Sequence, residues 1–297
     1  MSDAPCAGSG RTRLVVGCGY LGARVARRWL DAGDRVLAVT RRATRAAELA
    51  AAGLEPVVAD VADAAAPWLR LPPVATVFWA VGFDREGAAT PRDVHVAGLG
   101  RLLDGLAAGT RDARTPPPRF ILSSSTGVWG DERGGLVDES TPPRPARETG
   151  HVLVEAEAVL RSHPLGSGTA LRFAGLYGPG RLPRLDDLRA GRPVAADPDS
   201  WLNLVHVDDA ARAVVAVAAA ARPRPLYVVS DGRPVLRREW YGRLAALAGA
   251  PVPTWDPAAP RQRGENRRVN PALLFRDLDF APDHPDPLAA LADLLPR

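Results

Sequence analysis

Residues 13–22 read RLVVGCGYLG, a short apolar run followed by a glycine-rich turn, and a helical pattern continues from there to Ala32. Each glycine has a physical use in this setting. Gly17 permits a tight turn, Gly19 lets backbone amides approach an anion, and Gly22 lets helix and strand pack closely. The first N–H groups of a helix attract phosphate. The segment therefore predicts a strand–turn–helix that holds the diphosphate of a dinucleotide, with a glycine-rich turn without a ligand as the alternative.

The chain alternates short apolar runs with helical stretches, an arrangement typical of a parallel sheet covered by helices. The expected strands are 14–16, 36–40, 56–59, 76–81, 120–123, 170–173, 203–207 and 226–229. The expected helices are 21–32, 44–52, 94–108 and 150–161, one N-capped by Asp208, and one that begins at Arg237. We predict an α/β fold, a Rossmann-type doubly wound parallel sheet with a smaller C-terminal substrate-binding region.

The composition along the chain suggests how it is divided. Residues 1–12 are expected to form a flexible tail, and residues 13–174 a dinucleotide-binding Rossmann domain. Residues 175–297 are expected to form mainly a substrate-binding region, with a strand and a helix returning to the Rossmann domain near 203–221. The stretch from Gly175 to residue 200 is rich in glycine, proline and arginine, which favours an irregular loop.

Composition excludes several kinds of chemistry. All 38 basic residues counted as Lys+Arg are arginine, so chemistry that needs a titrating lysine is ruled out. Two cysteines, Cys6 and Cys18, cannot form a disulfide framework, and the dispersed histidines do not have the spacing of zinc ligands. We therefore predict no metal site.

The net charge of +4 does not indicate nucleic-acid binding, because the arginines are scattered among acidic residues and aromatic residues make up 6% of the chain. No apolar run is long enough to span a membrane, and the first residues contain no apolar signal segment. We expect a soluble cytoplasmic protein with no nucleic-acid or membrane partner.

The end of the second expected strand bears on which dinucleotide is bound. Residues 39–42 read VTRR and contain no carboxylate for the ribose hydroxyls of NAD, whereas arginine accommodates the 2′-phosphate of NADP. We predict NADP, with NAD as the alternative, and Arg41 and Arg42 as phosphate ligands. Asp60 ends the third strand, where its carboxylate either accepts from the adenine amino group or caps a turn.

Several segments together resemble the extended short-chain dehydrogenases/reductases of the NAD-dependent epimerase/dehydratase type. They are GCGYLG, the Asp60 strand end, VFWAVG, SSSTGVWG, LRFAGLYGPG and LNLVHVDDAARAV. The likeness covers nearly the whole length and is closest to a small atypical branch of that family. With the residues above, the expected cofactor-binding set is Gly17, Gly19, Tyr20, Leu21, Gly22, Arg41, Arg42, Asp60, Ala80, Val81, Gly82 and Ser123.

The active site that this resemblance implies is a Ser or Thr after the fifth strand and a Tyr-x-x-x-Lys pair on the next helix. Ser125 matches the serine, with Ser124 and Thr126 beside it. Thr149 stands where the tyrosine belongs and Leu153 where the lysine belongs. Ser125 and Thr149 are thus the candidate catalytic residues, and positioned acid/base catalysis worth about 10² to 10⁴ in rate is missing.

Other residues near these positions offer weak substitutes. His151 points away from Thr149 around the helix, so a surface role is favoured, and Glu148 suits the helix dipole better than a base. Glu155 lies on the same helix. Tyr177 precedes Arg181 by four residues, but within a Gly-Pro-Gly turn, which indicates a substrate loop or packing.

The leading interpretation is an NADP-dependent oxidoreductase that acts on a small or nucleotide-linked carbonyl or hydroxyl substrate with a degenerate active site. The alternative is a non-catalytic NADP-binding sensor or scaffold. His206 is expected to be a core or cleft histidine. The resemblance also allows a homodimer through the helices at 94–108 and 150–161.

Overall fold

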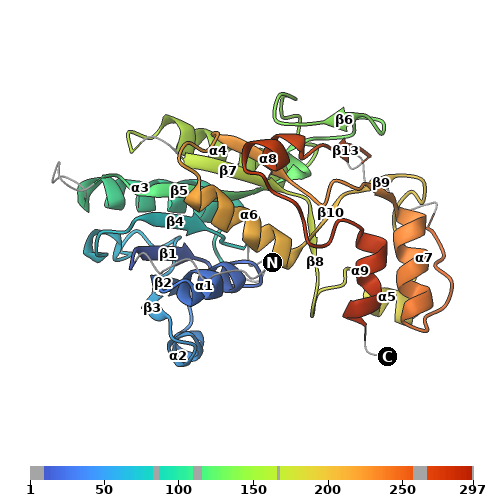
Figure 1. Ribbon diagram of the computed structural model, residues 1–297, viewed down its shortest axis with the longest axis horizontal. Coiled ribbons are helices and arrows are strands. Elements are labelled where there is room, and N and C mark those ends of the chain that lie inside the picture. The colour runs from blue at the N-terminus through green and yellow to red at the C-terminus, as the bar shows by residue number, and fades with distance from the viewer. Residues whose placement is uncertain (1–9, 83–86, 110–115, 166–167, 257–265, 296–297) are drawn as a thin grey trace. The chain divides into compact units, whose positions relative to one another are not determined.

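A computed structural model describes residues 10–82, 87–109, 116–165, 168–256 and 266–295. Its main sheet consists of β1 (Thr12–Val16), β2 (Arg35–Thr40), β3 (Glu55–Val58), β4 (Thr76–Trp79), β5 (Arg119–Ser125), β7 (Gly168–Phe173) and β11 (Leu226–Val229). The order across the sheet is β11-β7-β5-β4-β1-β2-β3, and the pairs β1–β2, β2–β3, β1–β4 and β4–β5 are parallel (Figure 1). The predicted α/β Rossmann-type fold is confirmed.

The chain forms two compact units, each made of three segments. The first unit comprises Met1–Ser124, Val152–Leu171 and Ala211–Pro225. The second comprises Ser125–His151, Arg172–Ala210 and Leu226–Arg297. Neither unit is therefore a continuous stretch of sequence.

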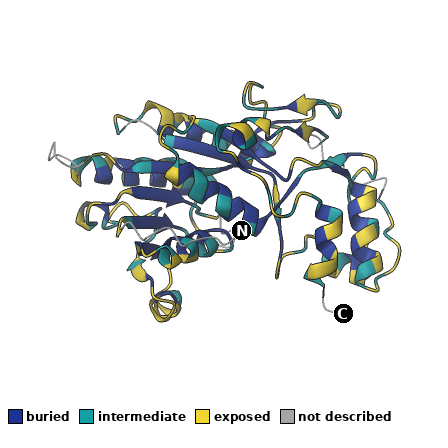
Figure 2. Cartoon of the chain, in the orientation of Figure 1, coloured by how far each residue is buried: buried dark blue, intermediate teal, exposed yellow. Residues whose placement is uncertain are grey.

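The central strands of the first unit are buried because they have neighbours on both sides. The runs Leu14–Val16 and Val77–Trp79 are each 0% exposed, which explains why the sequence shows continuous apolar runs instead of alternation (Figure 2). The longer helices of the chain up to β11 are α1 (Gly22–Asp31), α2 (Ala43–Ala51), α3 (Gly98–Gly109), α4 (Glu148–Ser162) and α6 (Val207–Ala219). On α1, Val25 and Trp29 are buried, whereas Arg27 and Asp31 are exposed and paired at 2.8 Å.

The strand order changes direction at β1, since the chain continues to β2 on one side and returns to β4 on the other. In open parallel sheets, ligands bind outside the carboxyl ends of the strands at such a point. The amino end of β1 is fixed separately. There Arg13 forms a buried ion pair with Asp34, with 2.8 Å between Nε and Oδ2, and also bonds the Thr76 hydroxyl.

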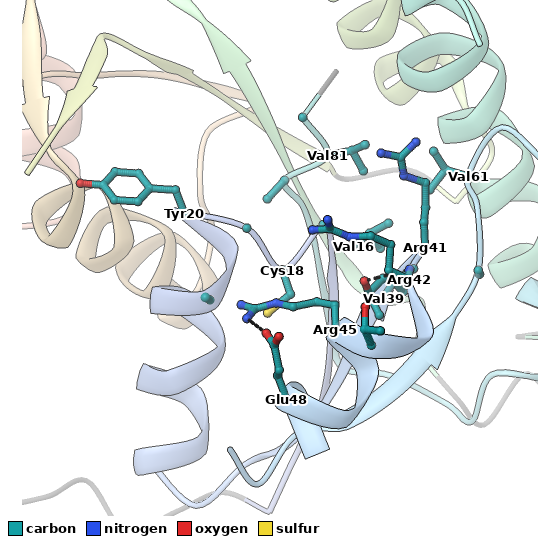
Figure 3. A pocket seen from close by; sticks show the side chains of 18 of the residues that line it. Val16, Cys18, Tyr20, Val39, Arg41, Arg42, Arg45, Glu48, Val61 and Val81 are labelled. Carbon is teal, nitrogen blue, oxygen red and sulfur yellow. Dashed lines mark hydrogen bonds and ion pairs between the residues drawn. The ribbon is translucent and has the colours of Figure 1, made fainter. Parts of the chain in front are cut away.

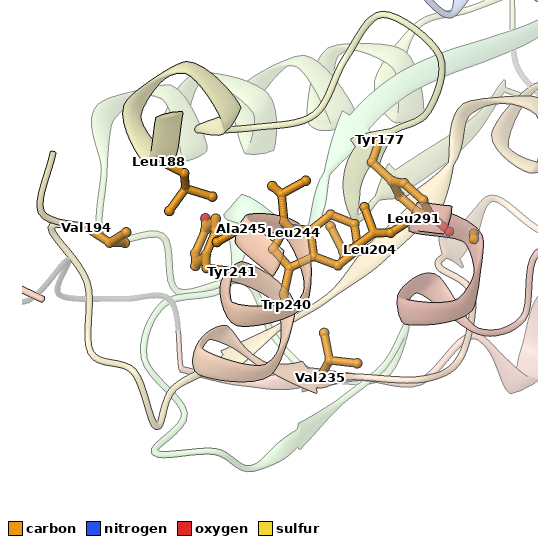
Figure 4. Packing of buried hydrophobic residues seen from close by; sticks show 11 residues of the cluster. Tyr177, Leu188, Val194, Leu204, Val235, Trp240, Tyr241, Leu244, Ala245 and Leu291 are labelled. Carbon is orange, nitrogen blue, oxygen red and sulfur yellow. The ribbon is translucent and has the colours of Figure 1, made fainter. Parts of the chain in front are cut away.

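The second unit contains short strand pairs and a helical core. Its small strands are β6 (Leu136–Val137), β8 (Gly175–Tyr177), β9 (Trp201–Leu202), β10 (Leu204–His206), β12 (Val235–Leu236) and β13 (Arg268–Val269), paired as β8–β10, β9–β12 and β6–β13. Its helices are α5 (Leu185–Arg189), α7 (Arg237–Leu247), α8 (Ala272–Asp277) and α9 (Pro287–Leu294). Trp240 and Leu244 of α7 pack with Tyr177, Leu204 and Leu291 to form the core of this unit (Figure 4).

Three short turns complete the described elements: η1 (Trp68–Arg70), the π-helical η2 (Asp93–Ala97) and η3 (Thr126–Val128). Within the described ranges, none of the helices combines the length and apolar character that crossing a bilayer requires. Residues 1–9 of the predicted tail, including Cys6, lie outside the described residues.

Two local predictions are wrong. Asp208 does not N-cap α6, because the helix begins at Val207 and Asp208 lies in its first turn, where its N–H donates to Nδ1 of His206 at 3.3 Å. The stretch after Gly175 is not irregular throughout. It begins with β8, which gains its hydrogen bonds from β10, and it contains α5.

Candidate functional site

The glycine loop joins β1 to α1 with the geometry that its three glycines predict. Gly17 has φ +92°, and a Cβ there would lie 2.6 Å from the carbonyl oxygen of Ala80. A Cβ on Gly22 would lie 2.2 Å from the carbonyl oxygen of Gly17. A Cβ on Gly19, by contrast, would meet nothing within 4 Å. Gly17 and Gly22 thus close the turn against β4 and the helix, and Gly19 leaves open space above it.

This open space belongs to a cavity of about 720 Å³, here called the glycine-loop cavity (Figure 3). Its lining is Val16, Gly17, Cys18, Gly19, Tyr20, Ala23, Arg24, Val39, Thr40, Arg41, Arg42, Thr44, Arg45, Glu48, Ala59, Val61, Ala80, Val81 and Gly82. All of these residues belong to the first unit. They come from the carboxyl ends of β1, β2 and β4, from the first turns of α1 and α2, and from the segment after β3. The strand order predicts a site at this edge of the sheet.

Two helix N-termini face this cavity without a capping side chain. Neither Leu21 before α1 nor Arg42 before α2 provides a side-chain cap, and neither helix has an acidic residue in its first turn. Unsatisfied N–H groups at a helix start attract anions. The cavity therefore offers two anion-binding positions, one at the glycine loop and one at the end of β2.

The position at the end of β2 is strongly basic. Arg41, Arg42 and Arg45 gather there, with Arg45 paired to Glu48 (Figure 3). The strand itself ends at Thr40, whose hydroxyl accepts from the Arg42 N–H at 3.4 Å. Sequence reasoning missed Arg45. The helical spacing of three residues from Arg42 is the signal that could have found it.

Cys18 also lines the cavity, but as a buried thiol. Its side chain is largely inaccessible, and burial raises its pKa from an ordinary 9.0 to about 11, an effect that the nearby Arg45 guanidinium partly opposes. The thiol is therefore protonated at neutral pH. It acts as a packing group in the loop and is a poor nucleophile.

Most of the predicted cofactor-binding residues lie at this cavity: Gly17, Gly19, Tyr20, Arg41, Arg42, Ala80, Val81 and Gly82. Leu21, Gly22 and Ser123 are not among its lining residues. The ring of Tyr20 points away from the arginines at the end of β2, and Arg24 stacks over that ring at 4.3 Å (Figure 3).

Asp60 lies in a neighbouring hollow of about 330 Å³ that shares Arg41, Val61, Val81 and Gly82 with the glycine-loop cavity. One carboxylate oxygen, Oδ1, accepts from the N–H of Ala62 at 2.8 Å. This bond is the turn cap that the sequence allowed for Asp60, and its contact with the adenine amino group stays a prediction.

The candidate catalytic residues Ser125 and Thr149 line another cavity, of about 280 Å³, here called the serine cavity. Its lining is Ser125, Thr126, Gly127, Ala146, Arg147, Thr149, Gly175, Trp201, Leu202, Asn203, Arg237 and Arg267, all of the second unit. The Ser125 hydroxyl accepts from the Gly127 N–H at 3.0 Å, which leaves its own proton available to donate. The neighbouring Ser124 donates instead to the buried Glu157 at 2.6 Å.

The substitutes considered from the sequence have other environments. His151 and Glu148 are exposed, and Glu155 pairs with Arg92 at 2.8 Å. Tyr177 is 0% exposed and packs edge-on against Trp240, and burial holds the pKa of its phenol well above its ordinary value. Of the two roles predicted for Tyr177, the structure contains the packing role.

His206 is buried and stacks on His284 with 3.7 Å between ring centroids. These two rings and Asp209 form a group of three potential metal ligands in the described part of the chain. The Asp209 carboxylate, however, already accepts from the N–H groups of Asp283 at 2.8 Å and His284 at 2.9 Å, and from Nδ1 of His284 at 2.9 Å. The group therefore fastens the C-terminal segment to the start of α6.

Comparison with known proteins agrees with this fold. A sequence model of the NAD dependent epimerase/dehydratase family matches residues 13–229. The chain therefore belongs to that family, and the resemblance inferred from its motifs is confirmed.

Individual relatives share about a quarter to a third of their residues with this chain. Protein YeeZ of Escherichia coli (strain K12) is 34% identical over 171 residues, which cover 58% of this chain and 60% of YeeZ. A structure of a putative NAD-dependent epimerase/dehydratase from Methylobacillus flagellatus is 29% identical with a TM-score of 0.77, covering 96% of this chain and 98% of that one. MoeE5 in complex with UDP-glucose and NAD is 23% identical with a TM-score of 0.76, covering 95% and 97%, and shows a shared fold.

Proposed function

We propose that this protein binds NADP(H) in the glycine-loop cavity and transfers a hydride between this cofactor and the carbonyl or hydroxyl carbon of a small substrate. The observation that carries the proposal is the cavity itself. It combines an open position above Gly19 with two uncapped helix starts and three arginines at the end of β2. Membership of the NAD-dependent epimerase/dehydratase family supports a nicotinamide dinucleotide.

The chemistry of the cavity fits such a group. The backbone around Gly19 would hold the diphosphate, because a side chain there would fill the space that the phosphates need. Arg41, Arg42 and Arg45 would hold a 2′-phosphate through charge-assisted hydrogen bonds. No acidic residue ends β2 at Thr40, so the bidentate partner that NAD ribose prefers is missing at that position.

When bound, the cofactor supplies or accepts the hydride. The residues of the chain orient the substrate and handle charge on its oxygen. We propose that the hydroxyls of Ser125 and Thr149, which both line the serine cavity, donate hydrogen bonds to the substrate oxygen. Neither hydroxyl ionises near neutral pH, so water exchanges the proton, and turnover is expected to be slow compared with an enzyme that has a positioned tyrosine.

The test is a fluorescence titration with NADPH and NADH. We expect NADPH to bind at least tenfold more tightly than NADH. Gly19→Val should abolish binding of both without unfolding the protein, because a Cβ at this position meets no protein atom within 4 Å. Gly100→Val is the matched control, since Gly100 also has open space around its Cβ position and lies outside the cavity. Equal NADPH affinity in Gly19→Val and Gly100→Val would refute the proposal.

One observation favours a second candidate, a non-catalytic NADP-binding sensor or scaffold. Among the described residues that line the serine cavity there is no histidine, tyrosine, cysteine, carboxylate or lysine that could carry a proton near neutral pH. Label transfer from deuterated NADPH to a carbonyl compound decides between the two. Stereospecific transfer supports the enzyme, and binding without any transfer across a panel of small carbonyl compounds supports the sensor.

A further inference from the structure

The described lining of the glycine-loop cavity contains a single acidic side chain, Glu48 of α2. Glu48 follows Arg45 by three residues, a spacing that brings two side chains together on one face of a helix. Nη1 of Arg45 donates to Oε2 of Glu48, so the two groups form an ion pair at the wall of the cavity (Figure 3). A carboxylate at this place opposes the binding of a phosphate, because like charges repel.

Arg42 and Arg45 therefore differ in what they offer to an anion. Within the described residues, the Arg42 guanidinium has no ion pair, and its side chain does not cap α2. The charge of Arg45 is balanced by Glu48 before any ligand arrives. A phosphate that meets Arg42 gains a new charge-assisted hydrogen bond, whereas a phosphate that meets Arg45 replaces an anionic partner that is already there. Arg42 thus contributes more than Arg45 to holding a phosphate.

The pair is open to solvent and can exchange partners. The side chains of Arg45 and Glu48 are 37% and 63% exposed. Exposed ion pairs are weak, so Arg45 can leave Glu48 for a phosphate at little cost. Glu48 then stays beside the bound phosphate as a negative charge. The net gain from Arg45 is small for this reason.

We propose that Glu48 is a specificity-determining residue, which limits the grip of the cavity on the 2′-phosphate of NADP(H) by competing with that phosphate for Arg45. Arg42 then carries most of the preference over NAD(H). This inference rests on the proposed binding of NADP(H) in the same cavity. All of the residues that it uses belong to the first unit.

A limited grip suits a cofactor that is exchanged in every catalytic cycle. The proposed reduction converts NADPH into NADP⁺, which must leave before the next turnover, and product release often sets the turnover rate. Differences in affinity between variants of one site lie mostly in the dissociation rate. Without the competing carboxylate, the cavity would release the nucleotide more slowly. Glu48 therefore favours an exchangeable cosubstrate over a nucleotide that stays bound.

The test is a double-mutant cycle read out by fluorescence titration with NADPH and NADH. NADH shares the diphosphate but has no 2′-phosphate, so the ratio of the two affinities reports the 2′-phosphate alone. We expect this ratio to rise about tenfold in Glu48→Gln and to fall about tenfold in Arg45→Gln, because each change leaves one charge of the pair without its partner. The double variant should lie within about threefold of the unmodified protein, because a neutral pair replaces a balanced one.

Glu55→Gln is the matched control. Glu55 accepts from Nε and Nη2 of Arg35 at 2.7 and 2.6 Å, in an exposed ion pair of the same unit that lies outside the cavity. The same loss of one negative charge should leave the affinity ratio unchanged there. Stopped-flow displacement of bound NADPH adds a kinetic measurement, and we expect slower dissociation from Glu48→Gln than from Glu55→Gln.

Three results would overturn the inference while leaving the proposed function in place. They are an affinity ratio that does not rise in Glu48→Gln, a double variant that binds NADPH as weakly as Arg45→Gln, and equal dissociation rates for Glu48→Gln and Glu55→Gln. Weaker NADH binding in Glu48→Gln would also overturn it, since Glu48 would then accept from ribose hydroxyls. Absence of NADPH binding by the unmodified protein would instead refute the proposed function itself.

Discussion

At the scale of single residues, the charge of Arg42 provides a direct test of cofactor choice. Arg42 precedes α2, lines the glycine-loop cavity and is exposed, so its replacement does not disturb packing. A charge-assisted hydrogen bond contributes about 1.5–3 kcal/mol, equivalent to roughly 10- to 100-fold in affinity. Arg42→Asp should therefore weaken NADPH by that factor and strengthen NADH, because the carboxylate can accept from ribose hydroxyls.

The measurement is a pair of fluorescence titrations on each protein. Arg27→Asp serves as the control, since Arg27 is exposed on α1 and does not line the cavity. If Arg42→Asp and Arg27→Asp bind NADPH equally well, the 2′-phosphate is not held at the end of β2.

Cys18 makes a pH-dependent contribution of defined sign. The pKa of its thiol is raised by burial to about 11 in the folded protein, against 9.0 for an exposed thiol. Below pH 9 both states keep the proton, so stability is unaffected. Between pH 9 and pH 11 the unfolded chain loses the proton and the folded chain keeps it, so stability falls as pH rises, by about 2–3 kcal/mol in total. Urea unfolding of the unmodified protein and of Cys18→Ala at pH 8 and pH 10.5 measures this contribution. If the unfolding free energy of both proteins changes by the same amount between the two pH values, the prediction is contradicted.

At the scale of elements, the first turn of α6 fastens the C-terminal segment through one carboxylate. Asp209 is 1% exposed and accepts from the N–H groups of Asp283 and His284 and from the His284 ring. A hydrogen bond to a charged acceptor contributes about 1.5–3 kcal/mol to stability, so Asp209→Asn, which removes the charge, is expected to cost about 3 kcal/mol of unfolding free energy. The neighbouring Asp208 is 40% exposed in its side chain, and Asp208→Asn should change stability by less than about 1 kcal/mol.

Urea unfolding of both variants gives these free energies, and hydrogen exchange of the Asp283 and His284 amides locates the effect. Faster exchange there in Asp209→Asn alone supports the fastening role. Unfolding midpoints that coincide for the two variants would show that the C-terminal segment is held by its apolar contacts instead.

Element boundaries also show what the sequence can and cannot predict. The strands β1, β2 and β11 follow from local apolar runs, and their predicted bounds agree with the structure to within two residues. The helix at 94–108 was predicted as one piece, but it begins with the π-helical turn η2. A Cβ on Gly98, where η2 passes into α3, would lie 2.7 Å from the carbonyl oxygen of Val61. That constraint comes from a residue far away in the chain, and no local pattern reveals it.

At the scale of the whole molecule, the two cavities differ in how far the sequence alone predicts them. The glycine-loop cavity was predictable because its decisive residues, from Gly17 to Arg42, lie in one strand–helix–strand unit with a known spacing. The serine cavity was predicted in part, through Ser125 and Thr149. Its arginines were not, because Arg147, Arg237 and Arg267 come from segments that are distant in sequence and meet only through tertiary structure. In a chain with 38 arginines and no lysine, composition gives no means of singling out these three.

Binding of NADPH to the glycine-loop cavity should raise the stability of the folded chain by mass action. NADPH present at 100 times its dissociation constant adds about 2.7 kcal/mol to the unfolding free energy of the structure that binds it. We therefore expect a rise of several degrees in the thermal midpoint with NADPH, no rise in Gly19→Val, and a full rise in Gly100→Val. A lower thermal midpoint of Gly19→Val without any ligand would mean that the substitution destabilises the protein itself, and calorimetric transitions measured without NADPH distinguish that case.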